Sequence, residues 1–279
     1  MQIQRKIGVC EFSFPCWGPI AIQMAGQAGF DGMQLADAGG LEAGFPFLNA
    51  FVRAAYLEAA EQAHIAFQAM HLHALFHSRL IDFASNTQKG EDARRSIRAG
   101  VEACVAMHIP TIMITITEIR SAEQYDNICS ALGYASTLCR DSGIQLSVET
   151  DLPPIQWHAL RERVGADMKL CFDTMNPKVY GIGEPADLIA EYGFETIDHF
   201  HVKDCSANAR GYFTKYTTPI RLIGQGETGF ANSAAMICSH DFSGWVVSET
   251  FYFFPEFLQQ DPVLLAQADV STLRNAFQT

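Results

Sequence analysis

Four residues with metal-binding or acid–base side chains each lie at the end of a short apolar segment in the second half of the chain. They are Glu149, Asp173, His201 and Glu249, which close the segments SVE, CFD, HFH and VSE. Side chains alternate between the two faces of a strand. Each of these residues therefore shares a strand face with the residue two positions before it. The pairs are Ser147 with Glu149, Cys171 with Asp173, and His199 with His201. If the four segments are neighbouring strands, three carboxylates and one imidazole converge.

Three carboxylates at one place need a counter-charge, because close carboxylates repel one another and raise one another's pKa. A divalent cation supplies that charge. Oxygen-rich ligands with one His suit Mn²⁺, Mg²⁺ or Co²⁺ better than a structural zinc ion, which prefers Cys and His. The four residues therefore predict a site for one divalent metal ion. The alternative is that each acid is an ordinary polar residue in a rim of loops.

The segments that must position these residues alternate between strand and helix. Short apolar strands are expected at 7–10, 33–36, 65–72, 111–116, 144–148, 168–172, 197–202 and 245–247. Helices are expected at 20–28, 48–63, 91–107 and 123–140, with further helical segments between and after the later strands. This alternation predicts a parallel sheet, and eight such units are typical of an α/β protein with a (β/α)8 barrel. In such a barrel the functional residues lie at the carboxyl ends of the strands.

A doubly wound open sheet is the alternative architecture. The chain carries no GxGxxG after the first strand and neither GxxxxGKS nor GxxxxGKT, which removes the usual nucleotide-binding function of such a sheet. No linker or low-complexity segment divides the sequence. We therefore predict one domain over 1–279.

The composition of the 279 residues restricts the class of protein further. Hydrophobic residues make up 48% and charged residues 18%, which supports a packed core and excludes disorder as the main state. The net charge of −12 makes the chain a poor general binder of nucleic acid or of anionic membranes. Eight Cys without a CxxC pair, no signal peptide and no long apolar run predict a cytoplasmic protein with reduced thiols.

The same segments resemble a known family, the xylose isomerase-like TIM barrels. The resemblance lies in SVETD, CFDTMNP, FHVKD and VVSETF, together with GFDGMQL and LIGQGETGF, and it covers nearly the whole chain. The family includes sugar-phosphate isomerases and epimerases, ketose 3-epimerases, inosose dehydratase and endonuclease IV. The resemblance implies that one divalent metal, commonly manganese in the sugar enzymes, is held by Glu149, Asp173, His201 and Glu249.

The chain departs from the family pattern at two places. Many members have His three positions after the sixth-strand Asp, and this chain has Asn176, as similar sugar-phosphate epimerases do. Relatives often end the second strand with Glu, where this chain has Gln34 with Asp37 beyond it. The contribution of the second strand to the site is therefore open.

This constellation suits proton transfer next to a carbonyl of a ketose or ketose phosphate. A metal that chelates the carbonyl oxygen and the adjacent hydroxyl stabilises a cis-enediolate, while Glu149 and Glu249 remove and return the proton. Return to the opposite face gives epimerisation, return to the neighbouring carbon gives isomerisation, and loss of a β-hydroxyl gives dehydration. The leading prediction is a metal-dependent sugar isomerase or epimerase.

Three other functions stay open at this point. The first is a keto-sugar or inosose dehydratase or lyase with the same metal site. The second is an endonuclease IV-like DNA repair enzyme, which Asn176, the lack of Asp or His in 207–226 and the net charge disfavour. The third is a non-catalytic sugar-binding barrel, although an unused metal cage would carry charge repulsion without function.

The predicted partners are a small-molecule sugar and a second copy of the chain. Further polar residues are candidates for binding the sugar. They are His71, His73, Glu118, Asn176, Lys203 and Arg221, and the segment of Arg221 also holds Arg210 and Lys215. Each has a structural alternative. The two His residues, expected on one face of the third strand, could be buried structural residues, and Asn176 could cap a loop. Ion pairs at the surface are the alternatives for Glu118 with Arg120 and for Lys203 with Asp204.

Two aromatic segments complete the candidate site. The run at 251–254, with Phe257, follows Glu249 and is expected either to roof the pocket or to lie in a subunit contact. The turn at 45–47 is expected to line the apolar end of the pocket.

Overall fold

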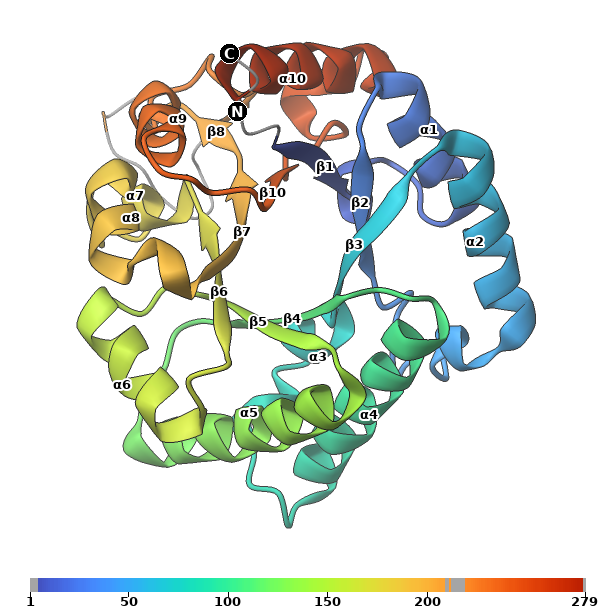
Figure 1. The fold of residues 1–279 in the computed structure, drawn as a ribbon, viewed down its shortest axis with the longest axis vertical. Helices are drawn as coiled ribbons and strands as arrows, with labels where there is room; N and C mark the ends of the chain where they lie inside the picture. Colours follow the sequence, from blue (N-terminus) through green and yellow to red (C-terminus); the bar gives the residue numbers. More distant parts are fainter. Residues whose placement is uncertain (1–4, 209–210, 212–218, 278–279) are drawn as a thin grey trace. The chain divides into compact units, whose positions relative to one another are not determined.

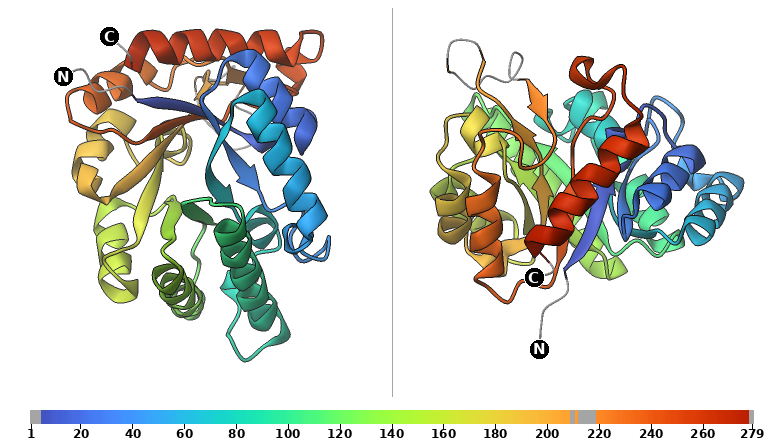
Figure 2. Two further views of the ribbon diagram at one scale, coloured as in Figure 1. Left: turned by 45° about the vertical axis from the view of Figure 1, so that its right-hand side comes forward. Right: turned by 90° about the horizontal axis from the view of Figure 1, so that it is seen from above.

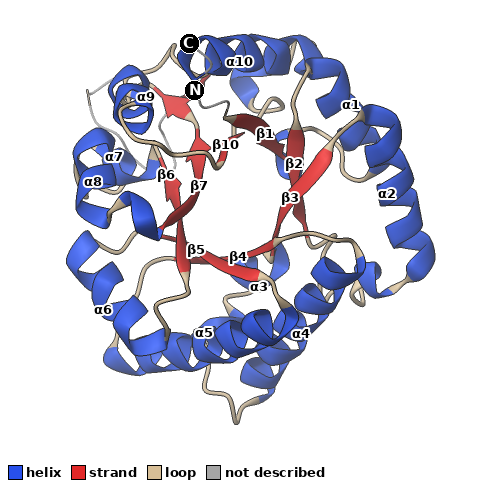
Figure 3. Ribbon diagram, in the orientation of Figure 1, coloured by secondary structure: helices blue, strands red, loops and turns tan. Residues whose placement is uncertain are grey.

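The structure is a computed structural model that describes residues 5–208, 211 and 219–277. Eight parallel strands form a closed barrel in the order β1-β10-β7-β6-β5-β4-β3-β2 (Figures 1 and 3). Their bounds are β1 Lys6–Cys10, β2 Gly32–Ala36, β3 Ala66–His71, β4 Thr111–Ile116, β5 Gln145–Thr150, β6 Lys169–Asp173, β7 Ile197–Val202 and β10 Trp245–Ser248. Two short strands, β8 (Asp204–Cys205) and β9 (Ile220–Arg221), form a separate antiparallel pair. The predicted (β/α)8 TIM barrel is confirmed, and the open sheet is excluded.

The helices follow the predicted alternation. Their bounds are α1 Pro19–Ala28, α2 Ala50–Ala63, α3 His73–His77, α4 Gln88–Ala106, α5 Ala122–Ser142, α6 Pro154–Val164, α7 Asn176–Val179, α8 Pro185–Tyr192, α9 Phe230–Cys238 and α10 Pro262–Phe277. The strand expected at 65–72 ends at His71, so His73 is the first residue of α3 and not a strand residue. Within the described ranges, no helix combines the length and the hydropathy of a membrane-spanning segment.

The chain forms two compact units, and the assignment of 1–279 to one domain stays a prediction. The first unit comprises Met1–Met33, Ala59–Ala66 and Cys171–Thr279. In it β10 pairs in parallel with β1 and with β7, and α10 packs against α1 and α9 (Figure 2). Its apolar side chains, including Ile7, Phe200 and Val246, are fully buried. This pairing places the carboxyl ends of β7 and β10 side by side.

The second unit comprises Gln34–Glu58 and Phe67–Leu170. Here β4 pairs in parallel with β5 along six residues, and α4 and α5 pack together. Thr87 and Ser121 cap the amino ends of these helices, because each side-chain oxygen accepts the backbone N–H three residues on. Gly100 lets α4 pack closely against Leu72, since a Cβ at position 100 would lie 2.6 Å from Leu72 Cδ2. The packed helices fix the ends of β4 and β5 from which polar side chains project.

Candidate metal centre

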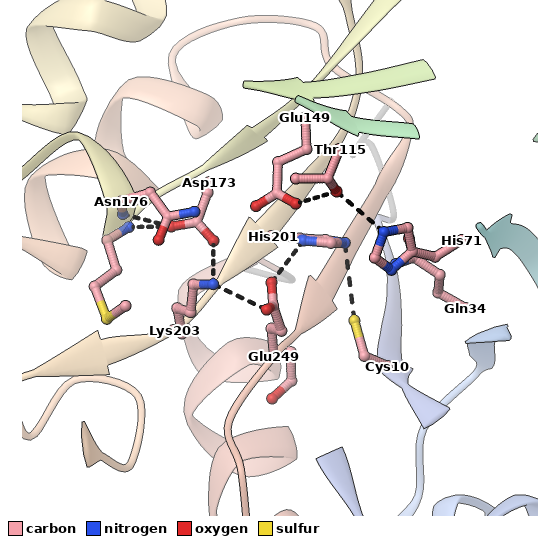
Figure 4. A network of polar contacts seen from close by, with 12 residues as sticks. Cys10, Gln34, His71, Thr115, Glu149, Asp173, Asn176, His201, Lys203 and Glu249 are labelled. Atoms are coloured by element: carbon pink, nitrogen blue, oxygen red, sulfur yellow. Dashed lines mark hydrogen bonds and ion pairs between the residues drawn. The ribbon is translucent and has the colours of Figure 1, made fainter. Parts of the chain in front are cut away.

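His201 lies near the end of β7 and is fully buried. Its Nδ1 is 2.7 Å from Glu249 Oε2, and its Nε2 is 3.8 Å from Cys10 Sγ (Figure 4). Glu249 directly follows β10, and Cys10 ends β1, so three neighbouring strands deliver these side chains to one place. The pairing register explains this, because Val247 lies opposite His201 and places Glu249 two residues beyond it.

Asp173 ends β6, and its two oxygens have different surroundings. Oδ1 accepts the backbone N–H groups of Met175 at 2.7 Å and Asn176 at 2.6 Å, where α7 begins. Oδ2 instead lies 3.0 Å from Lys203 Nζ. Burial raises the pKa of Asp173 above its ordinary value, although the Lys203 ammonium opposes this shift. The turn into α7 therefore fixes one oxygen and leaves the other directed into the cluster.

The interpretation of Lys203 as part of a surface ion pair with Asp204 is wrong, because its side chain is buried and contacts other carboxylates. Its side chain is 7% exposed, and Nζ contacts both Asp173 Oδ2 at 3.0 Å and Glu249 Oε1 at 2.9 Å. Burial alone would raise the pKa of Glu249, but Lys203 and His201 together lower it below its ordinary value. Lys203 therefore favours the ionised form of both carboxylates, and at Glu249 this effect outweighs burial.

Asp204, the expected partner of Lys203, organises a loop. Its carboxylate accepts the backbone N–H groups of Gly224 at 3.0 Å and Gly226 at 2.9 Å, and both the N–H and the hydroxyl of Thr228. A Cβ at Gly226 would collide with this carboxylate. The segment LIGQGETGF therefore folds around Asp204, which explains Gly226 in local structural terms.

The cluster fits a divalent cation. Asp173, His201 and Glu249 are buried, and each offers a ligand atom within 4.8 Å of the others. Within the described residues, Asp173 Oδ2 and Glu249 Oε2 have ionic neighbours but accept no well-directed hydrogen bond. Buried carboxylate oxygens of this kind are expected to be hydrogen-bonded or to bind a metal. Two carboxylates and one imidazole form a donor set that divalent cations accept.

Cys10 is a residue of this cluster that the sequence did not reveal. Its thiol, with His201 and Glu249, forms a second group of mutually close potential ligands. Burial raises the pKa of Cys10 to about 12. The side chain is therefore a neutral thiol near neutral pH, and its place beside the imidazole follows from the β1–β10–β7 pairing.

Glu149 lies on β5 and belongs to a hydrogen-bonded chain within the second unit. The register places Thr115 of β4 directly opposite it, and Thr115 Oγ1 donates to Glu149 Oε2 at 2.9 Å. Thr115 Oγ1 also lies 3.0 Å from His71 Nε2. Since a hydroxyl has one hydrogen, His71 must donate at this contact through Nε2–H. The chain His71–Thr115–Glu149 thus holds one oxygen of the carboxylate, and Thr115 is a second residue that sequence analysis missed.

The remaining predicted sugar contacts have local partners. Glu118 forms an ion pair with Arg120 at 2.5 Å, which agrees with the structural alternative for this pair. His73 Nε2 lies 3.0 Å from His77 Nε2, and Arg221 donates to the carbonyl of Ile220 at 3.3 Å. Arg210 and Lys215 lie outside the described residues. A sugar-binding role for each of these residues stays a prediction.

Gln34 of β2 and Asp37, the residue after this strand, have partners near β3 and α3. Gln34 is fully buried and accepts a hydrogen bond from Gln68 at 3.3 Å. Asp37 accepts the backbone N–H of Ala74, and burial raises the pKa of Asp37 to about 6. These contacts link β2 to β3 and α3 within the second unit, and the contribution of the second strand to the site stays open.

The aromatic segments form small ring clusters. Phe251 stacks on Phe254 with centroids 4.7 Å apart and contacts Phe12 at 6.1 Å. Phe45 and Phe47 line an apolar pocket of the second unit. The lid and subunit-contact interpretations of the 251–254 run both stay predictions.

The chain belongs to the xylose isomerase-like TIM barrel family, because the model of that family matches residues 22–275. Among solved structures, it is similar to a xylose isomerase domain protein from Planctomyces limnophilus, with 15% identity, a TM-score of 0.76 and 99% of each chain covered. It is also similar to D-psicose 3-epimerase with D-tagatose from Clostridium cellulolyticum H10, with 12% identity, a TM-score of 0.75, and 98% and 99% covered. A third similar structure is an IOLI protein with a zinc atom, with 16% identity, a TM-score of 0.75 and 98% of each chain covered. A comparison with curated protein sequences found no match.

Proposed function

We propose that this protein is a metal-dependent isomerase or epimerase of a ketose or ketose phosphate, located in the cytoplasm. The observation that carries the proposal is the buried cluster of Asp173, His201 and Glu249 at the carboxyl ends of neighbouring strands. Family membership supports it, since TIM-barrel enzymes carry their active sites at this end of the strands. The D-psicose 3-epimerase among the similar structures supports the choice of substrate class.

In this proposal the metal ligands are Glu149, Asp173, His201 and Glu249. The native ion is Mn²⁺, with Mg²⁺ or Co²⁺ as substitutes, because three carboxylates and one imidazole favour these ions over a structural zinc. The zinc atom of the similar IOLI protein makes Zn²⁺ a necessary comparison. When bound, the ion acts as a Lewis acid on the carbonyl and the adjacent hydroxyl of a ketose, which acidifies the carbon-bound proton between them.

Glu149 and Glu249 are the proposed acid–base pair. Thr115 holds Oε2 of Glu149, and Lys203 holds Oε1 of Glu249, so each carboxylate is oriented by a neighbour. Asp173 and His201 mainly orient the cation. One Glu takes the proton from carbon and the other returns a proton, either to the opposite face or to the neighbouring carbon.

The test is hydrogen exchange between substrate and solvent. Mn²⁺-loaded protein is incubated in D₂O with D-tagatose, D-fructose and further ketoses and their phosphates, and deuterium is located by NMR. We expect deuterium at one carbon next to the carbonyl and an epimer or aldose as the product. Glu149→Gln and Glu249→Gln, which keep size but remove the basic oxygen, should each lose ~10²–10⁴-fold in rate.

Other outcomes assign other functions. A β-elimination product would identify a dehydratase with the same metal site. Near-full turnover of both Gln variants would refute the proton-transfer mechanism. Ketose binding without exchange in the wild-type protein would indicate a sugar-binding barrel.

A further inference from the structure

A pair of imidazoles lies outside the residues used by the proposed reaction. His73 and His77 are the first and last residues of α3, and residues four apart on a helix share one face. Their Nε2 atoms lie 3.0 Å apart, and their ring centroids lie 4.2 Å apart. His77 is exposed and His73 is half-buried. The two nitrogens therefore lie side by side at a position where His77 is exposed to solvent.

The distance between these nitrogens suits two ligands of one metal ion. With metal–nitrogen bonds of about 2.0–2.1 Å, nitrogens 3.0 Å apart subtend an angle of roughly 94° at the metal. A tetrahedral ion such as Zn²⁺ has an angle of about 109° and a nitrogen separation of roughly 3.3 Å, so Zn²⁺ is the competing ion for this pair. An angle near 90° is the one found in square-planar and tetragonal sites, which Cu²⁺ and Ni²⁺ prefer.

We propose that His73 and His77 form a two-imidazole chelate for a tetragonal divalent cation, Ni²⁺ or Cu²⁺. Imidazole nitrogens are suitable ligands for both ions. In the absence of a metal, the same contact is an N–H···N hydrogen bond, and metal binding requires the donor ring to carry its proton on Nδ1 so that both Nε2 lone pairs are free.

The experiment is a calorimetric titration of the full chain with Ni²⁺ in the presence of saturating Mn²⁺. We expect wild-type protein to bind one equivalent of Ni²⁺ at the His73–His77 pair. The affinity at this site should fall at least ~tenfold in His77→Ala and in His73→Gln, since loss of even an outer partner of a metal ligand costs ~10–100-fold. His158→Ala, which removes an exposed imidazole from α6, is the matched control and should bind like the wild type.

The result that overturns the proposal is an equal number of Ni²⁺ equivalents, at equal affinity, in wild type, His77→Ala and His158→Ala. Far-UV circular dichroism of each variant shows that the fold is kept. His77 is exposed, so its replacement leaves the core unchanged. Any Ni²⁺ that displaces Mn²⁺ from the Asp173 cluster does so equally in all three proteins, and the difference between them reports the His73–His77 pair independently of the proposed function.

Discussion

At the scale of single residues, each carboxylate of the proposed site is oriented by a neighbour that contacts one of its oxygens. Backbone N–H groups hold Asp173, the Thr115 hydroxyl holds Glu149, and the Lys203 ammonium holds Glu249. A carboxylate fixed at one oxygen presents the other in a defined direction, which both metal binding and proton transfer require. Mutation of these positioning residues should therefore lower activity, as mutation of the ligands does.

Thr115→Val tests the orientation of Glu149. Valine keeps the shape of threonine but removes the hydroxyl, so Glu149 loses a hydrogen bond to a charged group that is worth about 1.5–3 kcal/mol. We expect kcat for the exchanging ketose to fall ~10–100-fold while KM changes little. Thr111→Val, a buried threonine on the same strand, is the control and should keep its turnover. Equal rates in the two variants would contradict a positioning role for Thr115.

Lys203→Met tests the charge balance of the cluster. The variant leaves Asp173 and Glu249 as buried carboxylates without their ammonium partner. Breaking a buried ion pair at one partner costs about 3–5 kcal/mol, so the free energy of unfolding in urea with EDTA should fall by that amount. Lys178→Met, which breaks a pair with exposed Glu184, should cost at most ~1 kcal/mol. A similar small loss in both variants would show that Lys203 is not needed for charge balance.

The sequence predicted residues within one strand better than contacts between strands. The short apolar segments correctly placed His201 and Glu249 near strand ends, because such segments are recognised from local sequence alone. Thr115 and Cys10 were missed, since their place beside Glu149 and His201 depends on the register of neighbouring strands. Lys203 was assigned to the rim because sequence gives no measure of burial for a charged residue beyond a strand end.

At the scale of elements, the end of β10 is tied to α10 by one buried carboxylate. Asp269 of α10 is fully buried and accepts the Ile223 N–H at 2.8 Å and the Tyr252 hydroxyl at 3.0 Å. The Ser248 hydroxyl, at the last residue of β10, lies 3.0 Å from the same Tyr252 hydroxyl. These bonds join α10, the loop after β9 and the residue before Glu249. The sequence predicts helix boundaries only to within a few residues. It does not predict this link, because the link joins residues far apart in the sequence.

The stability of this link should depend on pH. Burial raises the pKa of Asp269 to about 6, above its ordinary value, so the folded protein binds the proton more tightly than the unfolded chain. The stabilisation from this proton is therefore complete below the unfolded pKa and is lost as pH rises through about 6. Asp269→Asn mimics the protonated form. We expect the unfolding free energy of wild type, relative to Asp269→Asn, to fall by ~2.4 kcal/mol between pH 4 and 7.5, because the unfolded carboxyl is already partly ionised at pH 4.

Urea unfolding of both proteins across this pH range measures the difference. Asp241→Asn, at an exposed position, is the control and should show no such pH-dependent difference from wild type. A flat difference between wild type and Asp269→Asn would mean that Asp269 is charged in the fold without penalty.

At the scale of the whole molecule, the fold was predictable because eight short apolar segments alternate with helices along the chain. The order β1-β10-β7-β6-β5-β4-β3-β2 agrees with that expectation, including β6 between β5 and β7. What the pattern could not give is which polar groups become buried together, since that depends on barrel closure and on pairing between distant segments. The site is therefore a property of the closed strand order, to which β6, β7 and β10 each contribute one of the clustered ligands.

A bound ion should stabilise the whole chain, because a ligand that binds the folded state shifts the unfolding equilibrium. At a free metal concentration one hundred times the Kd, the expected gain is ~2.7 kcal/mol. We expect Mn²⁺ to raise the Tm by several degrees over EDTA-treated protein, with about one metal per chain in elemental analysis.

Asp173→Asn should remove both effects, because it loses one charged ligand of the cluster, while Asp141→Asn at an exposed helix end should keep them. Mn²⁺, Mg²⁺, Co²⁺ and Zn²⁺ compared in the same assay rank the ions. A Tm that no divalent ion raises in wild type, or that all raise equally in Asp173→Asn, would refute a metal site at this cluster.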